Sequence, residues 1–203
     1  MITTFKELRF FIKADDIMND QVYPKSLIKS LLFPCLIKKF LHNLRWLEYL
    51  EYKRKHNVAF MPLYLLCRIR YNRLKNKTGF DIPPNTIGYG VRIGHLSTIV
   101  INGNARIGNY CSFGNNIVIA DANHKNIGDF VQFGSNVVVA KQIDIADGCK
   151  VSSSSFVNKD ISNPNQLWGG VPARFIKDCN TWINEYPYQE EYQRCEDLKN
   201  KMI

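Results

Sequence analysis

The feature that most constrains this chain is a six-residue repeat that begins at Ile87. An apolar side chain recurs at every sixth position, apart from two steps of eight residues, and a small residue usually follows it. The apolar positions are Ile87, Ile93, Ile99, Ile107, Phe113, Ile119, Ile127, Phe133, Val139, Ile145, Val151 and Val157. Small residues tolerate the tight backbone of a turn, so each unit is predicted to be a short strand followed by a turn.

Three such units close a triangular coil, and stacked coils bury the apolar positions in one narrow core. About 75 residues of repeat predict roughly four coils whose strands pair in parallel. An ordinary β-sandwich would show alternation with a period of two instead. The repeat therefore predicts a mainly β chain, a parallel β-helix over residues 81–177, preceded by a different kind of segment.

The preceding segment is basic and has a helical pattern. Of a net charge of +9, residues 1–80 hold 16 Lys and Arg against 6 Asp and Glu. Apolar residues at three- and four-residue steps predict helices within 26–44, 45–55 and 61–74. We interpret 1–80 as an α-helical segment and 178–203 as a C-terminal helix or tail. The basic face is either solvated, or contacts an acidic partner or anionic lipid at the inner membrane face. No nucleic-acid motif accompanies it.

Two further patterns concern the cellular compartment. No apolar stretch approaches the ~20 residues that a membrane span needs, and Lys6, Glu7 and Arg9 interrupt the place of a signal-peptide core. The six cysteines are scattered without short paired spacings, which predicts buried thiols rather than disulfides or a zinc site. We therefore expect a cytoplasmic protein.

The repeat, followed by Gly169-Gly170-Val171-Pro172-Ala173-Arg174, resembles the left-handed β-helix acyltransferases. Residues 81–174 are most similar to the serine acetyltransferase branch, which includes glycan-modifying relatives. The resemblance implies left-handed coils, acetyl-CoA as co-substrate and no metal. It also implies a homotrimer with sites between neighbouring prisms.

Three residues are candidates for catalysis. Acyl transfer to a hydroxyl needs a base that works near neutral pH, and histidine fits this role. By the resemblance, His95 matches the general base, His124 a second active-site histidine, and Asp81 the aspartate that holds the base in its useful tautomer. Which histidine is the base stays open at this point. The alternatives are turn histidines without function and an Asp81 that only caps the first turn.

The resemblance also implies a set of cofactor residues. Ser135 and Ser153 match positions that meet the pantetheine arm of coenzyme A. Asn158, Lys159, Gly170 and Arg174 lie near its nucleotide end by the same similarity, and Lys159 and Arg174 have the charge that binds phosphates. Trp168 either covers the adenine or closes the end of the coil.

Two departures from the family pattern concern the acceptor. Serine-specific relatives carry an acid before the base and an arginine before the second histidine, whereas this chain has Gly94 and Asn123 at these substrate-binding positions. A site without both charged anchors should bind free serine poorly. We therefore expect a sugar hydroxyl of a surface glycan as acceptor. The alternatives are a serine O-acetyltransferase and a non-catalytic β-helix scaffold; a zinc carbonic anhydrase needs three histidine ligands, and this region has two.

Overall fold

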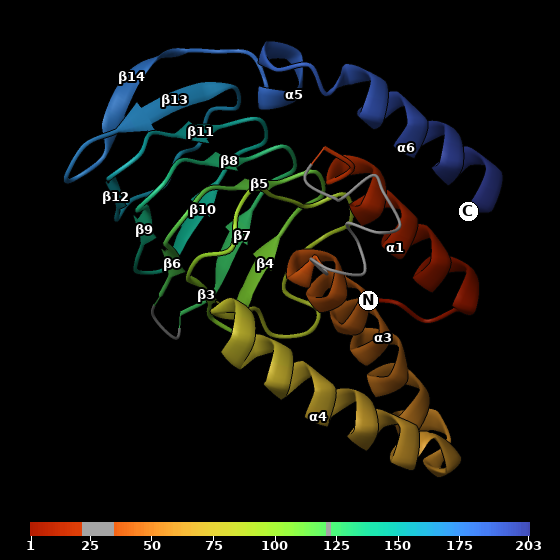
Figure 1. The fold of residues 1–203 in the computed structure, drawn as a ribbon. Helices are drawn as coiled ribbons and strands as arrows, with labels where there is room; N and C mark the ends of the chain where they lie inside the picture. The colour runs from red at the N-terminus through yellow and green to blue at the C-terminus, as the bar shows by residue number, and fades with distance from the viewer. Residues whose placement is uncertain (22–34, 121–122) are drawn as a thin grey trace.

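The computed structural model describes residues 1–21, 35–120 and 123–203. It contains a parallel β-helix, with helices packed at its N-terminal end and along one side (Figure 1). The helices are α1 (Phe5–Met18), α3 (Leu36–His56), the short 3-10 helix η1 (Val58–Phe60), α4 (Met61–Thr78), α5 (Trp182–Glu185) and α6 (Gln189–Met202). The part of the helix predicted over 26–44 that falls in 26–34 lies outside the described residues.

The strands form the three faces of a prism. Their bounds are β1 (Phe80–Asp81), β2 (Arg92–Ile93), β3 (Ile99–Ile101), β4 (Ala105–Ile107), β5 (Ser112–Phe113), β6 (Ile117–Ile119), β7 (Lys125–Ile127), β8 (Gln132–Phe133), β9 (Val138–Val139), β10 (Ile143–Ile145), β11 (Lys150–Val151), β12 (Phe156–Val157), β13 (Gln166–Gly169) and β14 (Arg174–Asp178). Sheet I has the order β1-β3-β6-β9-β12, sheet II β10-β7-β4, and sheet III β14-β13-β11-β8-β5-β2. All strands pair in parallel except β13 with β14.

The core confirms the repeat. All twelve apolar positions are buried, and repeat positions of successive coils pair in register, as Ile107 does with Ile127. The exception is Ile99, because Ile101 is the residue that pairs with Ile119. Phe113 and Phe133 stack with ring centroids 5.6 Å apart. The β-helix has about five turns rather than four, because Phe80 pairs with Ile99 and adds a level. The repeat does not reveal this level, since Phe80 and Ile87 are seven residues apart.

Small residues at the corners let the coils approach closely. A Cβ atom added to Gly108 would lie 2.2 Å from Asp129 Oδ1 and 2.6 Å from the carbonyl carbon of Gly128 in the next coil. No side chain fits that space without a shift of backbone. The glycines that follow the apolar positions therefore set the coil-to-coil spacing.

Local signals define the helix ends. Thr4 and Glu7 form a capping box at the start of α1, in which each side chain accepts from the other residue's backbone N–H. Helix α4 ends at Gly79, which has a φ of +77° in the left-handed region that glycine adopts at little cost. The sequence places the end of this helix at residue 74, and the structure extends it to Thr78.

Buried polar side chains of α1 and α3 cap the open end of the β-helix. The first coil has no coil before it, so its outer backbone groups need other partners. Asn19 accepts from Ile93 N and donates to Val91 O, and Glu48 accepts from Asn85 N. Arg45 completes the cap by donating to the carbonyl oxygen of Ile87.

Arg45 is fully buried and holds two buried carboxylates. Its Nε lies 2.8 Å from Asp15 Oδ2 and its Nη1 lies 3.1 Å from Glu48 Oε2. The same guanidinium donates to the carbonyl oxygens of Ile87 and Gly88 in the first coil. Burial raises the pKa of the Asp15 and Glu48 carboxyls, and the charge of Arg45 opposes that shift. This network joins the helices to the prism.

The C-terminal segment packs on the prism and on α1, and α6 runs beside α1 (Figure 1). Trp182 is buried and donates from Nε1 to Tyr110 O at 2.9 Å. Cys67, Cys111, Cys149 and Cys195 are buried, Cys35 and Cys179 are half-buried, and all six are free thiols. The prediction of buried thiols holds for four of them. In the described part of the chain, no helix is both long and apolar enough to cross a membrane.

Candidate active site

His95 lies at the corner where the chain leaves sheet III and enters sheet I, called the His95 corner below. The pairing register aligns Ile93, Phe113, Phe133 and Val151. Two residues beyond each of them stand His95, Asn115, Ser135 and Ser153, one per coil. The predicted base therefore heads a ladder that contains both predicted pantetheine contacts.

Backbone-to-side-chain bonds hold this ladder. Ser135 Oγ accepts from Asn115 N at 3.4 Å, and Ser153 Oγ accepts from Ser135 N at 3.1 Å. Each serine retains its hydroxyl proton for a ligand, because a hydroxyl both donates and accepts. The His95 side chain is exposed above them. The corner thus offers an accessible imidazole and two serine hydroxyls along one edge of the prism.

His124 lies at a different corner, where the chain passes from sheet I to sheet II, called the His124 corner below. It is exposed, and its Nε2 lies 2.8 Å from Asn126 Oδ1. Asn123 is exposed beside it, and its carbonyl oxygen accepts from the buried Lys125 Nζ at 3.1 Å. The lysine fixes the end of this loop. In the observed register one eight-residue step, from Ile119 to Ile127, falls at this corner, and the other, from Ile93 to Ile101, falls at the His95 corner.

The two histidines therefore stand on opposite edges of sheet I. Sheet I separates the His95 corner from the His124 corner within one chain. A cleft shared by both residues does not form in a single copy. Sequence spacing alone, 29 residues, does not distinguish between one corner and two.

Asp81 lies on β1, on the outer surface of sheet I. Its Oδ1 forms an ion pair with Lys75 Nζ at 2.6 Å, and about 40% of its side chain is exposed. Among the residues the structure describes, no hydrogen bond joins Asp81 to His95. The orienting role of Asp81 stays a prediction, and in this structure its partner is a lysine of α4.

The residues predicted for the nucleotide end are divided between the corners. Asn158 and Lys159 follow β12 at the His124 corner, and Lys159 Nζ lies 5.1 Å from the centre of the Trp168 ring. Gly170 belongs to the His95 side, because its N–H donates to Ser155 Oγ at 3.1 Å. Arg174 is exposed at the start of β14 and donates to Ala173 O.

The structure decides the position of Trp168. It pairs with Val151 in sheet III, at the level of the inward residues, and packs against the core. Its Nε1 donates to Gln166 Oε1 at 3.0 Å. Trp168 therefore closes the C-terminal end of the coils.

Arg92 lies next to the candidate site, and sequence reasoning did not single it out. Its side chain points outward from β2, and Gly94 follows two residues later in the turn. A Cβ atom added to Gly94 would lie 3.5 Å from Arg92 Nη1. Its Nε donates to Tyr188 OH at 2.8 Å, so a C-terminal residue holds the guanidinium. The only sequence signal is its outward position next to the His95 turn. Gly94 thus leaves an arginine beside the predicted base.

Comparisons with solved structures identify proteins of the same fold. No family model matches the sequence, and no curated protein matches it. Among solved structures, soybean serine acetyltransferase without ligand is 26% identical, with a TM-score of 0.65, covering 83% of this chain and 69% of that one. The Neisseria gonorrhoeae serine acetyltransferase is 22% identical, with a TM-score of 0.63, covering 88% of this chain and 69% of that one.

A serine acetyltransferase solved in complex with CoA is also similar, at 20% identity and a TM-score of 0.63, over 83% of this chain and 68% of that one. These neighbours support the same overall fold. The chain therefore has the left-handed β-helix fold of the hexapeptide-repeat acyltransferases, with serine acetyltransferases as its structural neighbours.

Proposed function

We propose that the chain is an acetyl-CoA-dependent O-acetyltransferase with His95 as its general base. The observation that carries the proposal is the His95 corner, where an exposed imidazole shares one ladder with Ser135 and Ser153. The imidazole accepts the proton of the acceptor hydroxyl as that oxygen forms a bond to the thioester carbonyl carbon. The carbon–sulfur bond then breaks, and the imidazolium returns the proton to the CoA thiolate.

The remaining predicted residues have supporting roles in this proposal. Ser135, Ser153 and the N–H groups of their corner line the edge along which a pantetheine arm extends. Lys159 and Arg174, which are both exposed, supply positive charge for the phosphates of the nucleotide. Asp81 orients the imidazole only after its carboxylate leaves Lys75, so its contribution depends on a rearrangement of that ion pair.

A homotrimer completes the site. The outward side chains of sheet I are apolar and half-buried at Val100, Val118, Val138 and Phe156, whereas those of sheet II are Arg106, Asn126 and Asp144. If sheet I of each prism faces a threefold axis, one of its edges meets the opposite edge in the next copy. The His95 corner of one copy then meets the His124 corner of its neighbour. The apolar face supports this arrangement because another copy would cover it.

The acceptor favoured by the comparisons is serine. The structural neighbours are serine acetyltransferases, and the guanidinium of Arg92 beside Gly94 has the charge that would bind the carboxylate of an amino-acid acceptor. This changes the order of the sequence-based expectation, which placed a sugar first. Gly94 and Asn123 keep a sugar hydroxyl as the second candidate, since both lack a charge that would hold an amino acid.

Thiol release from acetyl-CoA tests the activity and the acceptor together. We expect turnover with L-serine that exceeds turnover with each of a panel of sugars and nucleotide-sugars. His95→Ala should lower kcat by about 10²–10⁴-fold, the usual contribution of a general base. His56→Ala is the matched control, because His56 is an exposed histidine of α3 and should leave the rate unchanged.

Turnover only on a sugar would move the acceptor to the second candidate. An unchanged rate in His95→Ala would remove His95 as the base. Silence on every acceptor, together with no binding of coenzyme A, would favour the scaffold alternative.

Mixing two inactive variants tests the shared site. Co-expressed His95→Ala and His124→Ala chains should form trimers in which an intact His95 meets an intact His124, and activity should return to a fraction of the wild-type value. Separately expressed variants, assayed without exchange, are the control. If activity does not return although mixed trimers form, the two histidines do not act across an interface.

We also infer a reducing compartment, the cytoplasm, for this activity. The six free thiols support it, since proteins exported to an oxidising environment usually pair their cysteines in disulfides. Acetyltransferase activity should therefore persist in a buffer with reduced glutathione and fall in an oxidising buffer.

A further inference from the structure

The hairpin of α3 and α4 carries an exposed apolar tip that none of the described residues covers. Val58 of η1 is 76% exposed, and on α4 Leu65, Leu66 and Ile69 are 51%, 65% and 50% exposed. Leu63 is 49% exposed on the same helix. Single exposed apolar residues are ordinary, but five on one tip form a contiguous candidate for a contact.

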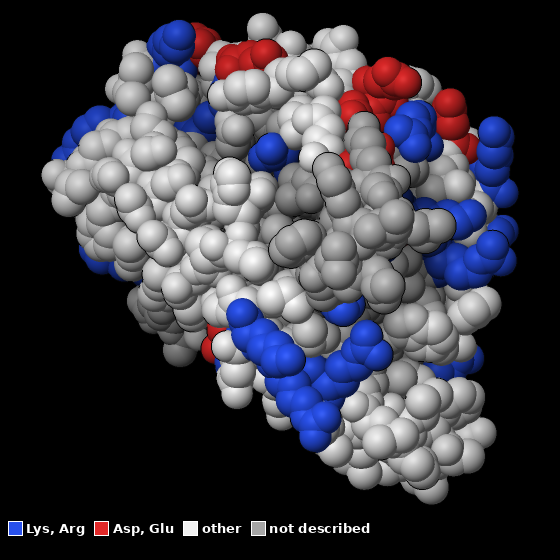
Figure 2. Space-filling view, in the orientation of Figure 1, with Lys and Arg blue, Asp and Glu red and all other residues white. Residues whose placement is uncertain are grey.

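A basic band follows the apolar tip along α4. Leu63, Leu66, Arg70, Arg73 and Lys77 recur at three- and four-residue steps and therefore share one face of the helix. Leu66 and Arg73 are seven residues apart, which is about 10 Å along the helix axis. In Figure 2 the tip is free of charged side chains on the visible face, and Lys and Arg gather next to it over the hairpin.

Helix α4 has no acidic residue to neutralise this band. It holds Arg68, Arg70, Arg73, Lys75 and Lys77, of which Lys75 pairs with Asp81 of the β-helix. Lys53 and Arg54 at the end of α3 lie over the rings of Tyr49 and Tyr64 and add to the positive charge near the tip. Lys75 and Arg54 have acidic partners, whereas within residues 35–120 and the rest of the described chain no ion pair involves Arg70, Arg73 or Lys77. The surface therefore combines positive charge with exposed leucines.

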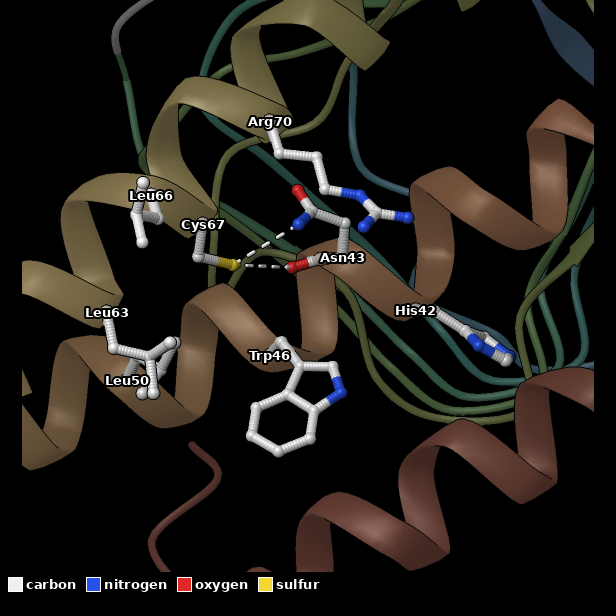
Figure 3. Close-up of a pocket in the computed structure, with 8 residues that line it drawn as sticks. All are labelled: His42, Asn43, Trp46, Leu50, Leu63, Leu66, Cys67 and Arg70. Atoms are coloured by element: carbon white, nitrogen blue, oxygen red, sulfur yellow. Dashed lines mark hydrogen bonds between the residues drawn. The ribbon is translucent and has the colours of Figure 1, made fainter.

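A groove between α3 and α4 has the same polarity along its length (Figure 3). Its volume is about 480 Å³, and residues of both helices line it. Leu50 and Leu63 lie together at its tip end, and Asn43 and Arg70 lie together at the other end. The buried Asn43 Oδ1 has no hydrogen-bond partner among the described residues. The groove is thus apolar toward the tip and polar toward the basic band.

We propose that the α3–α4 hairpin docks on an anionic lipid bilayer. The apolar tip enters the boundary of the acyl chains, and Arg70, Arg73 and Lys77 meet the phosphates at headgroup depth. If α4 stands upright on the membrane with its N-terminal end inserted, Leu66 lies about 10 Å deeper than Arg73. Each cation near an anionic surface strengthens such binding. The proposal is independent of acetyl transfer.

Charge and shape together favour lipid over other occupants. A second copy docked through α4 would bring two bands of like charge together, which opposes association. An acidic protein or a nucleic acid would satisfy the band but has no need of five exposed apolar residues. A bilayer offers both an anionic layer and an apolar layer in the required order.

Co-sedimentation with vesicles tests the proposal on the full chain. We expect binding to phosphatidylcholine vesicles that contain phosphatidylglycerol, little binding to phosphatidylcholine alone, and weaker binding as salt increases. The triple variant Arg70→Gln/Arg73→Gln/Lys77→Gln should lower the partition coefficient by about a hundredfold. The matched control is Lys6→Gln/Arg9→Gln/Lys13→Gln, which removes three exposed cations from α1 and should retain most of the binding.

A second variant tests insertion. Leu65→Ser/Leu66→Ser/Ile69→Ser should weaken binding while circular dichroism and thermal unfolding stay those of the parent chain. Lipids brominated on their acyl chains should quench Trp46, which lines the groove, in a chain with Trp168→Phe and Trp182→Phe.

Four results would overturn the proposal. These are equal losses in the two cation variants, equal binding to neutral vesicles, vesicle binding unaffected by the serine variant, and binding to polyglutamate or DNA without any binding to anionic vesicles. A serine variant that loses self-association instead of vesicle binding would assign the tip to a second copy.

Discussion

The β-helix and the α3–α4 hairpin bury their apolar residues in opposite ways. Each coil of the β-helix covers the coil before it, so Ile99, Ile117 and their equivalents lose their contact with water within one structure. Helix α4 buries only one side, at Cys67, Tyr71, Leu74 and Thr78, and leaves Leu63, Leu65 and Leu66 exposed. The comparison teaches that a repeat supplies its own packing partner, whereas a helix pair outside the repeat depends on whatever contacts it.

The boundary between the two regions is polar and buried. Arg45 of α3 joins Asp15 of α1 to Glu48 and to the carbonyl groups of the first coil. The β-helix needs this cap because most of its first coil has no preceding strand to pair with. The helices therefore stabilise the prism at one end, and their far tip is left for another partner.

The largest expected effect comes from breaking this boundary. Arg45→Met should lower the free energy of unfolding by about 3–5 kcal/mol, because it leaves two carboxylates buried without a counter-charge. Denaturant titration followed by circular dichroism measures the change. The control is Lys55→Met. Lys55 Nζ lies 4.0 Å from Glu51 Oε1 and its side chain is 57% exposed, so the substitution should change the free energy of unfolding by less than about 1 kcal/mol. Similar values for both variants would contradict the capping role.

The second prediction compares truncation in the two regions directly. Ile119→Ala in the core of the β-helix should cost about 2–5 kcal/mol, since it removes buried methyl groups and leaves a cavity. Leu65→Ala on α4 should stay within about 0.5 kcal/mol, because that side chain is half exposed. The same denaturant titrations apply. A cost at Leu65 as large as that at Ile119 would mean that the tip is already covered in the free protein.

The third prediction concerns the corners. Gly108→Ala should destabilise the β-helix by about 1–3 kcal/mol, because the added Cβ meets the backbone of the next coil. At Gly103, nothing lies within 4 Å of an added Cβ, so Gly103→Ala should be neutral or slightly stabilising. Thermal unfolding distinguishes the two, and equal melting temperatures would show that the coils adjust more freely than their spacing indicates.

The prediction with the smallest expected effect concerns cysteine reactivity and needs no substitution. Burial raises the pKa of Cys67 to about 11 and that of Cys195 to about 12, so at neutral pH both stay protonated and shielded. Cys35 and Cys179 are more accessible and should react first with iodoacetamide. Mass spectrometry of a time course gives the order. Early labelling of Cys67 would indicate that α3 and α4 separate in solution.

The sequence predicted the β-helix well because the signal is periodic and short-range. The twelve apolar positions and the small residues after them fix strand, turn and coil without reference to distant residues. The repeat does not predict the extra coil at Phe80, because the seven-residue step from Phe80 to Ile87 breaks the period. The apolar pattern also does not predict that α4 extends to Thr78, because Gly79, which ends the helix, lies beyond that pattern.

The candidate site was predicted less completely. His95, Ser135 and Ser153 were chosen separately by resemblance, and the register places them in one ladder. Spacing could not show that His124 occupies another corner, that Asp81 pairs with Lys75, or that Arg92 lies beside Gly94. Lys75 belongs to α4, and the corner of each histidine depends on the register between coils. For Arg92 and Gly94, which are two residues apart, the linear pattern does not show which way the side chain turns.

The sequence by itself determined the prism, because a six-residue period and a narrow core permit few other chain paths. Only the tertiary structure decided the corner on which each functional residue stands and which polar groups close the first coil. It also decided which side of α4 remains exposed. The physical reason is range: a strand and its turn form from neighbours in the chain, whereas corners, caps and exposed faces depend on contacts between residues far apart in sequence.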